Sequence, residues 1–500
     1  MTDTKYDVDF NFDNSYAKQL DGFYTPFIGD AAPNPKLIKF NKSLANKLGL
    51  DFSCLASKDI AAILSGGVSL KGGAPLAQVY AGHQFGGFSP RLGDGRALLL
   101  GEVIDPDGNR HDIHLKGSGR TTYSRGGDGK AALAPVLREY LLGEAMHALG
   151  VPTTRALAAV ATGENVYRDA LLPGAVLART ASSHIRVGTY QYFAAQGDYE
   201  KVKQLADYTI ERHFLDLKVS QKPYLGLLRM VCDRQALLLA KWMQIGFVHG
   251  VMNTDNMTIS GETIDYGPCA FIDHYDASAV FSSIDHQGRY AFENQMPMAQ
   301  WNLARLAETL LPFIDENSDE SVKLAMEEIR IFSETYQQLW LEGMCKKIGL
   351  TNVLAGDLTI IEQLLKLMQT EKVDFTLMFR ALSGALYEGE GEGGFEALRI
   401  QFNASSDFDE WLILWQQRAL KEPSDPEARA ALMNSVNPLY IPRNHLVEAA
   451  LQAAEQDSNF EPFEKLMTVL EKPFDKRQGF EEYAKPAPLE FGQYKTFCGT

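Results

Sequence analysis

Three glycine-rich loops that also carry arginine or lysine are the first residues of this chain that could do chemistry. They are Arg91–Arg96, Lys116–Arg120 and Arg125–Lys130. Glycine lets backbone approach an anion closely, and guanidinium groups bind phosphate oxygens in pairs. A single loop of this kind is more often a solvated turn, since isolated Gly-x-Gly strings are weak signals. Three of them around one small sheet indicate a phosphate-binding site, with Gly93, Gly95 and Arg96 of the first loop as candidate contacts.

Lys116 and Glu139 form the second candidate group. Lys116 ends a predicted strand, and Glu139 follows about twenty residues later in a predicted helix. Kinase-type folds use this arrangement to fix a phosphate-binding lysine with a carboxylate. The alternative is an exposed lysine and a solvated glutamate, whose pairing would contribute little.

A third group lies between His249 and Gly267. Kinases place a base Asp, a metal-binding Asn and an Asp-aromatic-Gly metal ligand in this order. Asn256 stands seven residues after His249, where His-Gly-Asp phosphotransferases carry their metal-binding Asn, but Val251 occupies the position of the usual base. Asp255 is the only carboxylate in that loop and becomes the candidate proton acceptor. The alternative is a polar turn held by Asx hydrogen bonds.

Asn256 and Asp265 offer hard oxygen ligands suited to Mg²⁺ bridging nucleotide phosphates. Arg179 and Arg186 could clamp the terminal phosphates, although for either one alone a structural ion pair is the commoner role. An aspartate of ordinary pKa, roughly 3.9, is ionised at pH 7, so we expect Asp255 to accept a hydrogen bond without tuning.

These residues need a small sheet and a helical platform to position them. Residues 95–117 predict a β-hairpin around the turn Pro106–Asn109, and the spacing after Pro135 predicts a helix that stops at Gly150. Strand-like segments at 156–161 and 175–179 follow. A hairpin, a helix and further strands describe an α+β sheet carrying one helix, and helical periodicity dominates after about residue 190.

The chain length sets the domain organisation. Its 500 residues exceed a single hydrophobic core. We expect an N-terminal extension at 1–75 that is a linker and not a core, a nucleotide-binding unit at 76–190, a helical unit with the catalytic and metal loops at 191–345, and a mostly helical C-terminal extension at 346–500.

Composition excludes several classes of function. A net charge of −16 makes nucleic acid and anionic lipid unlikely partners. No apolar run approaches the roughly 18–20 residues of a membrane span, and the acidic N-terminus is unlike a secretory or transit signal. The five cysteines are scattered without a C-x-x-C pair, which favours a reducing compartment. We therefore expect a cytoplasmic protein.

Taken together, five strings resemble the selenoprotein O (SelO, YdiU) family over nearly the whole chain. They are Tyr80–Gly86, Leu92–Arg96, His249–Asn256, Asp265–Gly267, and Asn437-Pro438 with Ile441–His445. The resemblance implies a bilobal protein-kinase-like fold, a pseudokinase, with N- and C-terminal extensions. It implies a protein adenylyltransferase that moves AMP from ATP to Ser, Thr or Tyr hydroxyls of target proteins. ATP would lie inverted relative to kinases, exposing its α-phosphate.

The resemblance also implies roles for individual residues. Those around the nucleotide would be Gly93, Gly95, Arg96, Lys116, Asp128, Gly129, Arg179, Arg186 and Asp265. Glu139 would pair with Lys116, Asp255 would be the proton acceptor, and Asn256 with Asp265 would hold Mg²⁺ or Mn²⁺. The missing base at Val251 is consistent with a chain that does not run ordinary phosphoryl transfer.

The C-terminus departs from the family's eukaryotic members, which carry selenocysteine where this chain ends Phe497-Cys498-Gly499-Thr500. Cysteine is the bacterial-type substitute. Cys269 follows Asp265 by four residues, and we hypothesise a regulatory Cys269–Cys498 disulfide, the alternative being two independent thiols. A redox-active tail would suit target proteins that are themselves redox-related.

Three alternatives to AMP transfer stay open from the sequence. They are UMP transfer from UTP, a phosphotransferase that uses Asp255 as its base, and a nucleotide-binding scaffold without catalysis. Retention of Lys116, Glu139, Asp255, Asn256 and Asp265 argues against the scaffold.

Overall fold

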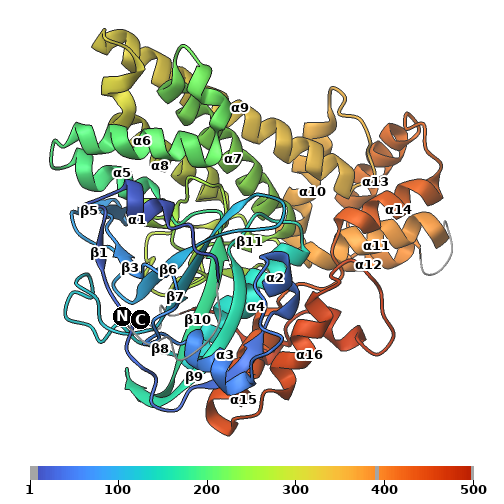
Figure 1. The fold of residues 1–500 in the computed structure, drawn as a ribbon. Helices are drawn as coiled ribbons and strands as arrows, with labels where there is room; N and C mark the ends of the chain where they lie inside the picture. The colour runs from blue at the N-terminus through green and yellow to red at the C-terminus, as the bar shows by residue number, and fades with distance from the viewer. Residues whose placement is uncertain (1–9, 389–393, 497–500) are drawn as a thin grey trace.

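The computed structural model describes residues 10–388 and 394–496 and contains one large sheet, two short two-stranded sheets and a set of helices (Figure 1). The large sheet contains β1 (Tyr24–Pro26), β2 (Lys36–Phe40), β3 (Leu76–Gln78), β6 (Ala97–Ile104), β7 (Arg110–Lys116), β8 (Ala131–Ala132), β9 (Arg155–Tyr167) and β10 (Leu171–Ala181). The short sheets pair β4 (Gly82–Gln84) with β5 (Gly87–Ser89), and β11 (Phe247–Val248) with β12 (Ala270–Phe271).

The large sheet runs in the order β1-β3-β6-β7-β10-β9-β2, with β8 beside β10, and its neighbours pair antiparallel. Side chains of a strand alternate between its faces, and the two faces here bury different cores. Leu98, Leu100 and Val176 join a cluster with the helices of the N-terminal part, whereas Leu99 and Leu177 join the central cluster with the long helix that follows β8.

The helices fall into three groups. Near the sheet lie α1 (Ser15–Gln19), α2 (Lys42–Lys47), α3 (Ser57–Ile63) and α4 (Leu133–Ala148). The central group contains α5 (Val187–Ala194), α6 (Tyr199–His213), α7 (Pro223–Ile245), α8 (Gln295–Ile314) and α9 (Ser318–Lys347). The last group contains α10 (Asp357–Glu371), α11 (Phe375–Glu388), α12 (Phe395–Gln401), α13 (Ser406–Ala419), α14 (Pro426–Val436), α15 (Asn444–Asp457) and α16 (Glu461–Leu470).

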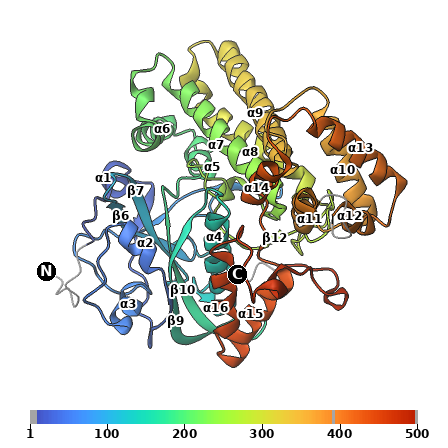
Figure 2. The same cartoon turned by 90° about the vertical axis from the view of Figure 1, so that its right-hand side faces the viewer.

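The last helices return to the sheet. Figure 2 shows α15 and α16 beside α4, and both helices share the central hydrophobic cluster with it. By contrast, α10–α14 close a separate cluster around Trp411 and Trp415 with the C-terminal end of α9. The mixed α+β class expected from the sequence is confirmed, and so are the hairpin β6–β7, the helix α4 and the mainly helical character after about residue 190.

The expectation that residues 1–75 form a linker and not a core is wrong for their described part. β1 and β2 lie at the two edges of the large sheet, and Leu44, Leu48 and Ile60 are buried against it. The physical reason is long-range strand pairing: β2 pairs with β9, which sequence periodicity does not reveal. Among the helices of the described ranges, none has the length and apolar character to cross a bilayer.

Candidate active site

A cleft of about 910 Å³ lies where the large sheet, α4 and the loops after β11 meet. It is lined by all of the nucleotide, metal and catalytic residues predicted from the sequence. These residues are Gly93, Gly95, Arg96, Lys116, Asp128, Gly129, Glu139, Arg179, Arg186, Asp255, Asn256 and Asp265. Residues separated by more than 170 positions therefore face one volume large enough for a nucleotide.

Strand alternation explains how the cationic residues reach the cleft. Leu115 and Ala178 point to the cluster on the far face of the sheet, so their neighbours Lys116 and Arg179 point to the face that carries α4. Glu139 lies on α4, on the side that faces these two strands. The sheet and the helix thus place Lys116, Arg179 and Glu139 on facing surfaces, where their side chains can meet directly.

Five charged side chains meet at the centre of the cleft. Lys116 Nζ lies 2.7 Å from Glu139 Oε2 and 2.6 Å from Asp265 Oδ1. Arg179 Nη1 donates to the same two carboxylates at 2.7 and 2.6 Å, and Arg186 Nη1 donates to Asp265 Oδ2 at 3.0 Å. Asp94 Oδ1 lies 4.0 Å from Arg186 as well, so the three cations are gathered and paired with carboxylates at one point, where phosphate oxygens could replace those partners.

The pKa values of the two carboxyl groups follow from these contacts. Burial alone would raise the pKa of Asp265, but Lys116, Arg179 and Arg186 outweigh it and hold that pKa well below its usual value. Burial likewise opposes ionisation of Glu139, and Lys116 with Arg179 lowers its pKa on balance. Both groups are therefore carboxylates at neutral pH, and the cations are held in place before any ligand binds.

The glycine-rich loops need their glycines for packing against one another. Gly93 has φ +71°, and a Cβ there would lie 2.4 Å from the ring of Tyr123. Gly129 has φ +70°, and a Cβ there would lie 2.0 Å from the carbonyl oxygen of Gly119. Larger residues at these positions would push the loops apart. The glycines thus set the wall of the cleft as well as leaving backbone open to an anion.

Asp128 lies at the rim of the cleft and pairs with Arg168, which belongs to no recognisable sequence motif. Arg168 Nη1 lies 2.8 Å from Asp128 Oδ2, and Arg168 Nη2 donates to the carbonyl of Lys130 at 2.7 Å. Arg168 comes from the turn between β9 and β10 and itself lines the cleft. The pair ties the Arg125–Lys130 loop to the sheet.

Asp255 lines the cleft from a short 3-10 turn, Thr254–Asn256. Burial raises its pKa to about 6, against the opposing effects of Arg186 and of a hydrogen bond from Gln84. Its Oδ1 is buried and accepts no hydrogen bond. The expectation of an ordinary aspartate pKa is therefore wrong. The raised value makes Asp255 a stronger base that is still mostly ionised at pH 7.

Asn256 and Asp265 are suited to a divalent cation by the chemistry of their donors. Asn256 Nδ2 donates to the carbonyl of Val251 at 3.0 Å, which turns its amide oxygen away from that bond and leaves it available. Within the described ranges no three His, Cys, Asp or Glu side chains form a metal cluster. Two protein oxygens completed by phosphate oxygens match the usual Mg²⁺ arrangement at nucleotide sites.

Several residues that support the site were not selected from the sequence. The guanidinium of Arg186 lies 4.4 Å from the centre of the Tyr80 ring, and Arg179 Nε donates to His114 Nδ1 at 3.3 Å. Asp94 is buried beside both His114 and Arg186. Tyr80 and Asp94 lie inside two of the family strings, Tyr80–Gly86 and Leu92–Arg96, and this was the only sequence feature that could have identified them. No sequence feature identifies His114.

Cys269 is buried behind the cleft, and burial raises the pKa of its thiol to about 11 although Arg138 opposes this effect. A thiol with a raised pKa is a poor nucleophile. Cys498, its hypothesised partner, lies outside the described residues. A disulfide between them would require the buried Cys269 to become accessible, so the pair stays a hypothesis.

The last family string, around Arg443, has a structural place. Arg443 Nη1 lies 2.7 Å from both Asp273 Oδ1 and Asp374 Oδ2, and Asn444 Nδ2 donates to the carbonyl of Phe271 in β12. These contacts fix the start of α15 to the segment that follows Asp265. The string therefore supports the site from behind without lining it.

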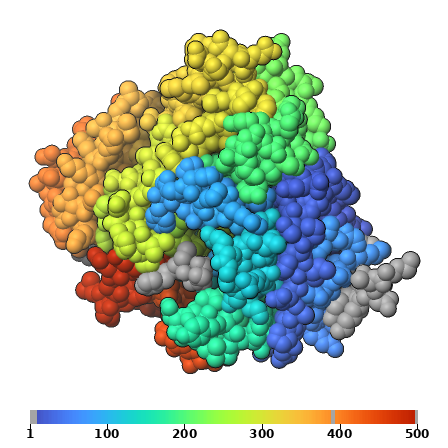
Figure 3. All heavy atoms as spheres, turned by 90° about the vertical axis from the view of Figure 1, so that its left-hand side faces the viewer, coloured from blue at the N-terminus to red at the C-terminus, as the bar shows by residue number. Residues whose placement is uncertain are grey.

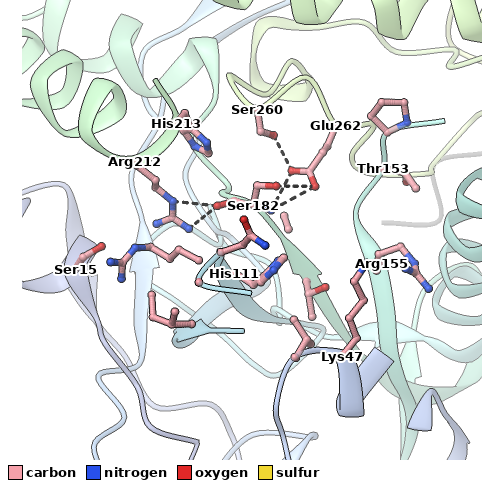
Figure 4. A pocket seen from close by; sticks show the side chains of 18 of the residues that line it. Ser15, Lys47, His111, Thr153, Arg155, Ser182, Arg212, His213, Ser260 and Glu262 are labelled. Carbon is pink, nitrogen blue, oxygen red and sulfur yellow. Dashed lines mark hydrogen bonds between the residues drawn. The ribbon is translucent and has the colours of Figure 1, made fainter. Parts of the chain in front are cut away.

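A second cavity of about 760 Å³ lies between the sheet and the helices α2, α6 and α7 (Figure 4). Its charged groups are largely paired with one another or with residues just behind the wall. Arg212 lies 2.6 Å from Glu102 and from Asp112, and Glu262 accepts hydrogen bonds from Ser182 and Ser260. These bonds join the end of β10 to the helical part, which indicates a structural junction.

Comparison with known proteins places these observations in a family. The chain matches the family model described as "Protein adenylyltransferase SelO" over residues 7–471. A protein of Rhizobium etli named "Protein nucleotidyltransferase YdiU" is 54% identical over 491 residues, which cover 98% of this chain and 97% of that protein. Proteins of the same name from Rhizobium meliloti and Rhodopseudomonas palustris are each 53% identical, over 98% and 99% of this chain and 99% and 100% of theirs.

Proposed function

The chain belongs to the SelO family of protein adenylyltransferases, and we propose that it transfers AMP from ATP to Ser, Thr or Tyr hydroxyls of target proteins. It is a protein nucleotidyltransferase by its family, and the proposal specifies the nucleotide and the acceptor. The observation that carries it is the arrangement of the cleft, in which three paired cations stand beside a buried aspartate.

The nucleotide would bind with its phosphates against Lys116, Arg179 and Arg186. Each of these cations already has a carboxylate partner, so phosphate oxygens can join or replace those contacts without the side chains having to be ordered first. Arg179 and Arg186 are the candidates for stabilising the charge that develops on pyrophosphate as it leaves.

Transfer needs a base close to the incoming hydroxyl. In the proposed step the acceptor oxygen attacks the α-phosphorus, and the bond from that phosphorus to the bridging oxygen breaks. Pyrophosphate leaves with the bonding electron pair, and the hydroxyl proton passes to Asp255. The carboxyl group of Asp255 lines the cleft and would accept it.

A divalent cation would be held by Asn256 and Asp265, and Mg²⁺ or Mn²⁺ would neutralise phosphate charge there. The fit rests on their hard oxygen donors and on the cleft position of both residues. Asp265 would exchange part of its contact with the three cations for the metal, while Glu139 would keep Lys116 and Arg179 paired.

We extend the proposal to the architecture. The sheet with α4 would form the N-terminal lobe of a kinase-like fold, and α5–α9 with the loops after β11 would form the C-terminal lobe, close to the expected limits 76–190 and 191–345. The contact of Lys116 with Glu139 of α4 and the position of Asp265 support this division. The part of 1–75 that is described would belong to the first lobe, and 346–500 would be a helical extension.

The test uses ATP labelled at either the α- or the γ-phosphate, with Mg²⁺ or Mn²⁺ and a cytosolic extract as acceptor. We expect α-label on protein and none from γ-label, with the α-label falling to a small residual rate in Asp255→Asn. Label arriving only from the γ-phosphate would identify a phosphotransferase instead. Parallel reactions with α-labelled UTP decide the nucleotide, and identifying the labelled proteins tests whether the targets are redox-related.

A further inference from the structure

The β4–β5 hairpin lies directly over the loop that carries Asp255. The backbone N–H of His83 donates to Thr254 Oγ1 at 2.7 Å, and that of Phe85 donates to Asn253 Oδ1 at 3.2 Å. Just before the hairpin, Ala81 N donates to the carbonyl of Gly188 in α5. The space-filling view shows this segment, in blue, lying across the yellow-green part of the chain with a hollow beneath it (Figure 3).

Gln84 contacts the carboxyl group of Asp255 itself. Its Nε2 donates to Asp255 Oδ2 at 3.2 Å across 171 positions of sequence. The other oxygen, Oδ1, is buried and has no hydrogen-bond partner in the described structure. One oxygen of the carboxylate is thus held by the Gln84 amide, and the other, packed inside the protein, has no competing hydrogen bond, so Gln84 is the side chain that orients the group.

Gly82 packs closely against the oxygen that has no hydrogen-bond partner. A Cβ at this position would lie 2.7 Å from Asp255 Oδ1 and 3.1 Å from its Cγ. Any other residue would therefore displace the carboxylate or fill the volume next to Oδ1. Gly82 has no positive φ in this structure, so backbone conformation does not explain the glycine and the close approach does.

From these contacts we propose that the β4–β5 hairpin sets the geometry of the base: Gln84 is a positioning residue that fixes Asp255, and Gly82 lets the hairpin backbone pack directly against the carboxyl group. The inference rests on the proposed function and names the part of the chain that prepares its acceptor side. Gln84 and Phe85 both line the cleft, so the hairpin also borders the path by which an acceptor would reach Asp255.

The chemistry of glutamine fits this role better than that of other donors. A lysine or arginine would form an ion pair with the carboxylate and weaken it as a base, whereas a neutral amide orients it with little change of charge. Glutamate in the same place would have no proton to donate and would repel Asp255. A methionine would keep the length of the side chain and remove the hydrogen bond.

The experiment compares Gln84→Met with Gln338→Met. Gln338 lies on the exposed face of α9 and also donates to a carboxylate, Glu342 Oε1, at 2.9 Å, so it is a matched control. We expect Gln84→Met to lower kcat for α-label transfer about 10- to 100-fold. The dissociation constant of ATP and the melting temperature should stay within error of the wild type, and Gln338→Met should change none of these.

A double-mutant cycle identifies the residue through which Gln84 acts. In an Asp255→Asn background, Gln84→Met should have no further effect on the residual transfer rate, because the group it positions is already inactive. Gly82→Ala should lower kcat with ATP binding retained. Losses that multiply in the double variant, or an equal loss of ATP affinity, would overturn the inference and leave the hairpin a packing element.

Failure of the inference and failure of the proposed function give different results. If the wild type transfers no α-label, the proposed function fails. If the wild type transfers α-label and Gln84→Met transfers it at the same rate, the function stands and the inference about Gln84 is wrong.

Discussion

Two largely buried lysines, one in the cleft and one at the start of the C-terminal helices, differ in the polar groups that surround their ammonium groups. The side chain of Lys116 in the cleft is 14% exposed and contacts the carboxylates of Glu139 and Asp265. Lys347 at the end of α9 is 3% exposed, and its only polar side-chain contact in the described structure is Asn437 Oδ1 at 2.8 Å. Its ammonium nitrogen lies 4.0 Å from the centre of the Phe379 ring.

The two lysines differ in the partners that burial leaves them. Burial without a carboxylate lowers the pKa of Lys347 to about 7, so this lysine can become neutral near physiological pH. Lys116 instead contacts two carboxylates, which phosphate oxygens could replace. The surroundings of Lys116 therefore suit the proposed phosphate site, whereas those of Lys347 suit packing.

The largest expected effect follows from Asp265→Asn, which removes the charge shared by the three cations of the cleft. We expect transfer of AMP to fall roughly 1,000-fold, because metal coordination and phosphate positioning are worth several kcal/mol together. The protein should stay folded, since Glu139 still pairs with Lys116 and Arg179. The measurements are the α-label transfer rate and the thermal unfolding curve.

The matched control is Asp357→Asn in the helical region, where Asp357 is buried and lies 2.6 Å from Arg418 Nε. This change should cost about 3–5 kcal/mol of stability and leave the transfer rate of the folded protein unchanged. If Asp357→Asn abolished transfer while folded, or Asp265→Asn did not, the distinction between the two regions would be lost.

Lys116→Met should have the next largest effect. It removes one phosphate-binding cation but leaves Glu139 and Asp265 paired with arginine, so kcat/KM for ATP should fall about 100-fold with little change in folding. Lys465→Met, at an exposed helix position paired with Glu461, is the control and should be silent. Steady-state kinetics at several ATP concentrations check both, and a wild-type kcat/KM in Lys116→Met would contradict the role assigned to the lysine.

Lys347→Met tests the lysine outside the cleft by its effect on how stability depends on pH. Between about pH 7 and the ordinary lysine pKa near 10.4, the unfolded chain binds a proton at Lys347 that the folded chain has released. Stability of the wild type should therefore gain up to about 1.4 kcal/mol per pH unit from this group as pH rises. The methionine variant should lack that gain and keep its transfer rate. Urea unfolding of both proteins from pH 7 to 9 measures the difference, and parallel curves would refute the prediction.

The sequence predicted the parts of this site that depend on local pattern. The hairpin β6–β7, the helix α4 and the loop before Asn256 were recognisable because turn residues, helical spacing and family strings lie within short stretches. The same is true of the cleft residues that those elements carry. Their arrangement around one volume follows once the strands alternate and α4 covers the sheet.

The sequence could not predict what depends on distant pairing or on burial. The contact of Gln84 with Asp255 spans 171 positions, and β2 reaches the sheet edge only through β9. The pKa of Asp255 rises to about 6 because the folded hairpin and loops exclude water from it, and no sequence pattern carries that information. Arg168 likewise has no motif, and only the folded turn between β9 and β10 brings it to Asp128.

Arg168→Ala should have the smallest effect of the substitutions in the cleft. The pair is partly exposed, 21% for Arg168 and 42% for Asp128, so water screens it and its loss should change stability by less than about 1 kcal/mol. The Arg125–Lys130 loop would lose its tie to the sheet, however, and with it some of the order that the phosphates require. We therefore expect KM for ATP to rise about 3- to 5-fold with kcat unchanged, because a loosened wall weakens ground- and transition-state binding alike.

Arg399→Ala, which removes a comparable exposed pair with Asp409 among the C-terminal helices, should leave KM unchanged. Equal kinetics in the two variants would mean that the loop is ordered by its glycine packing alone.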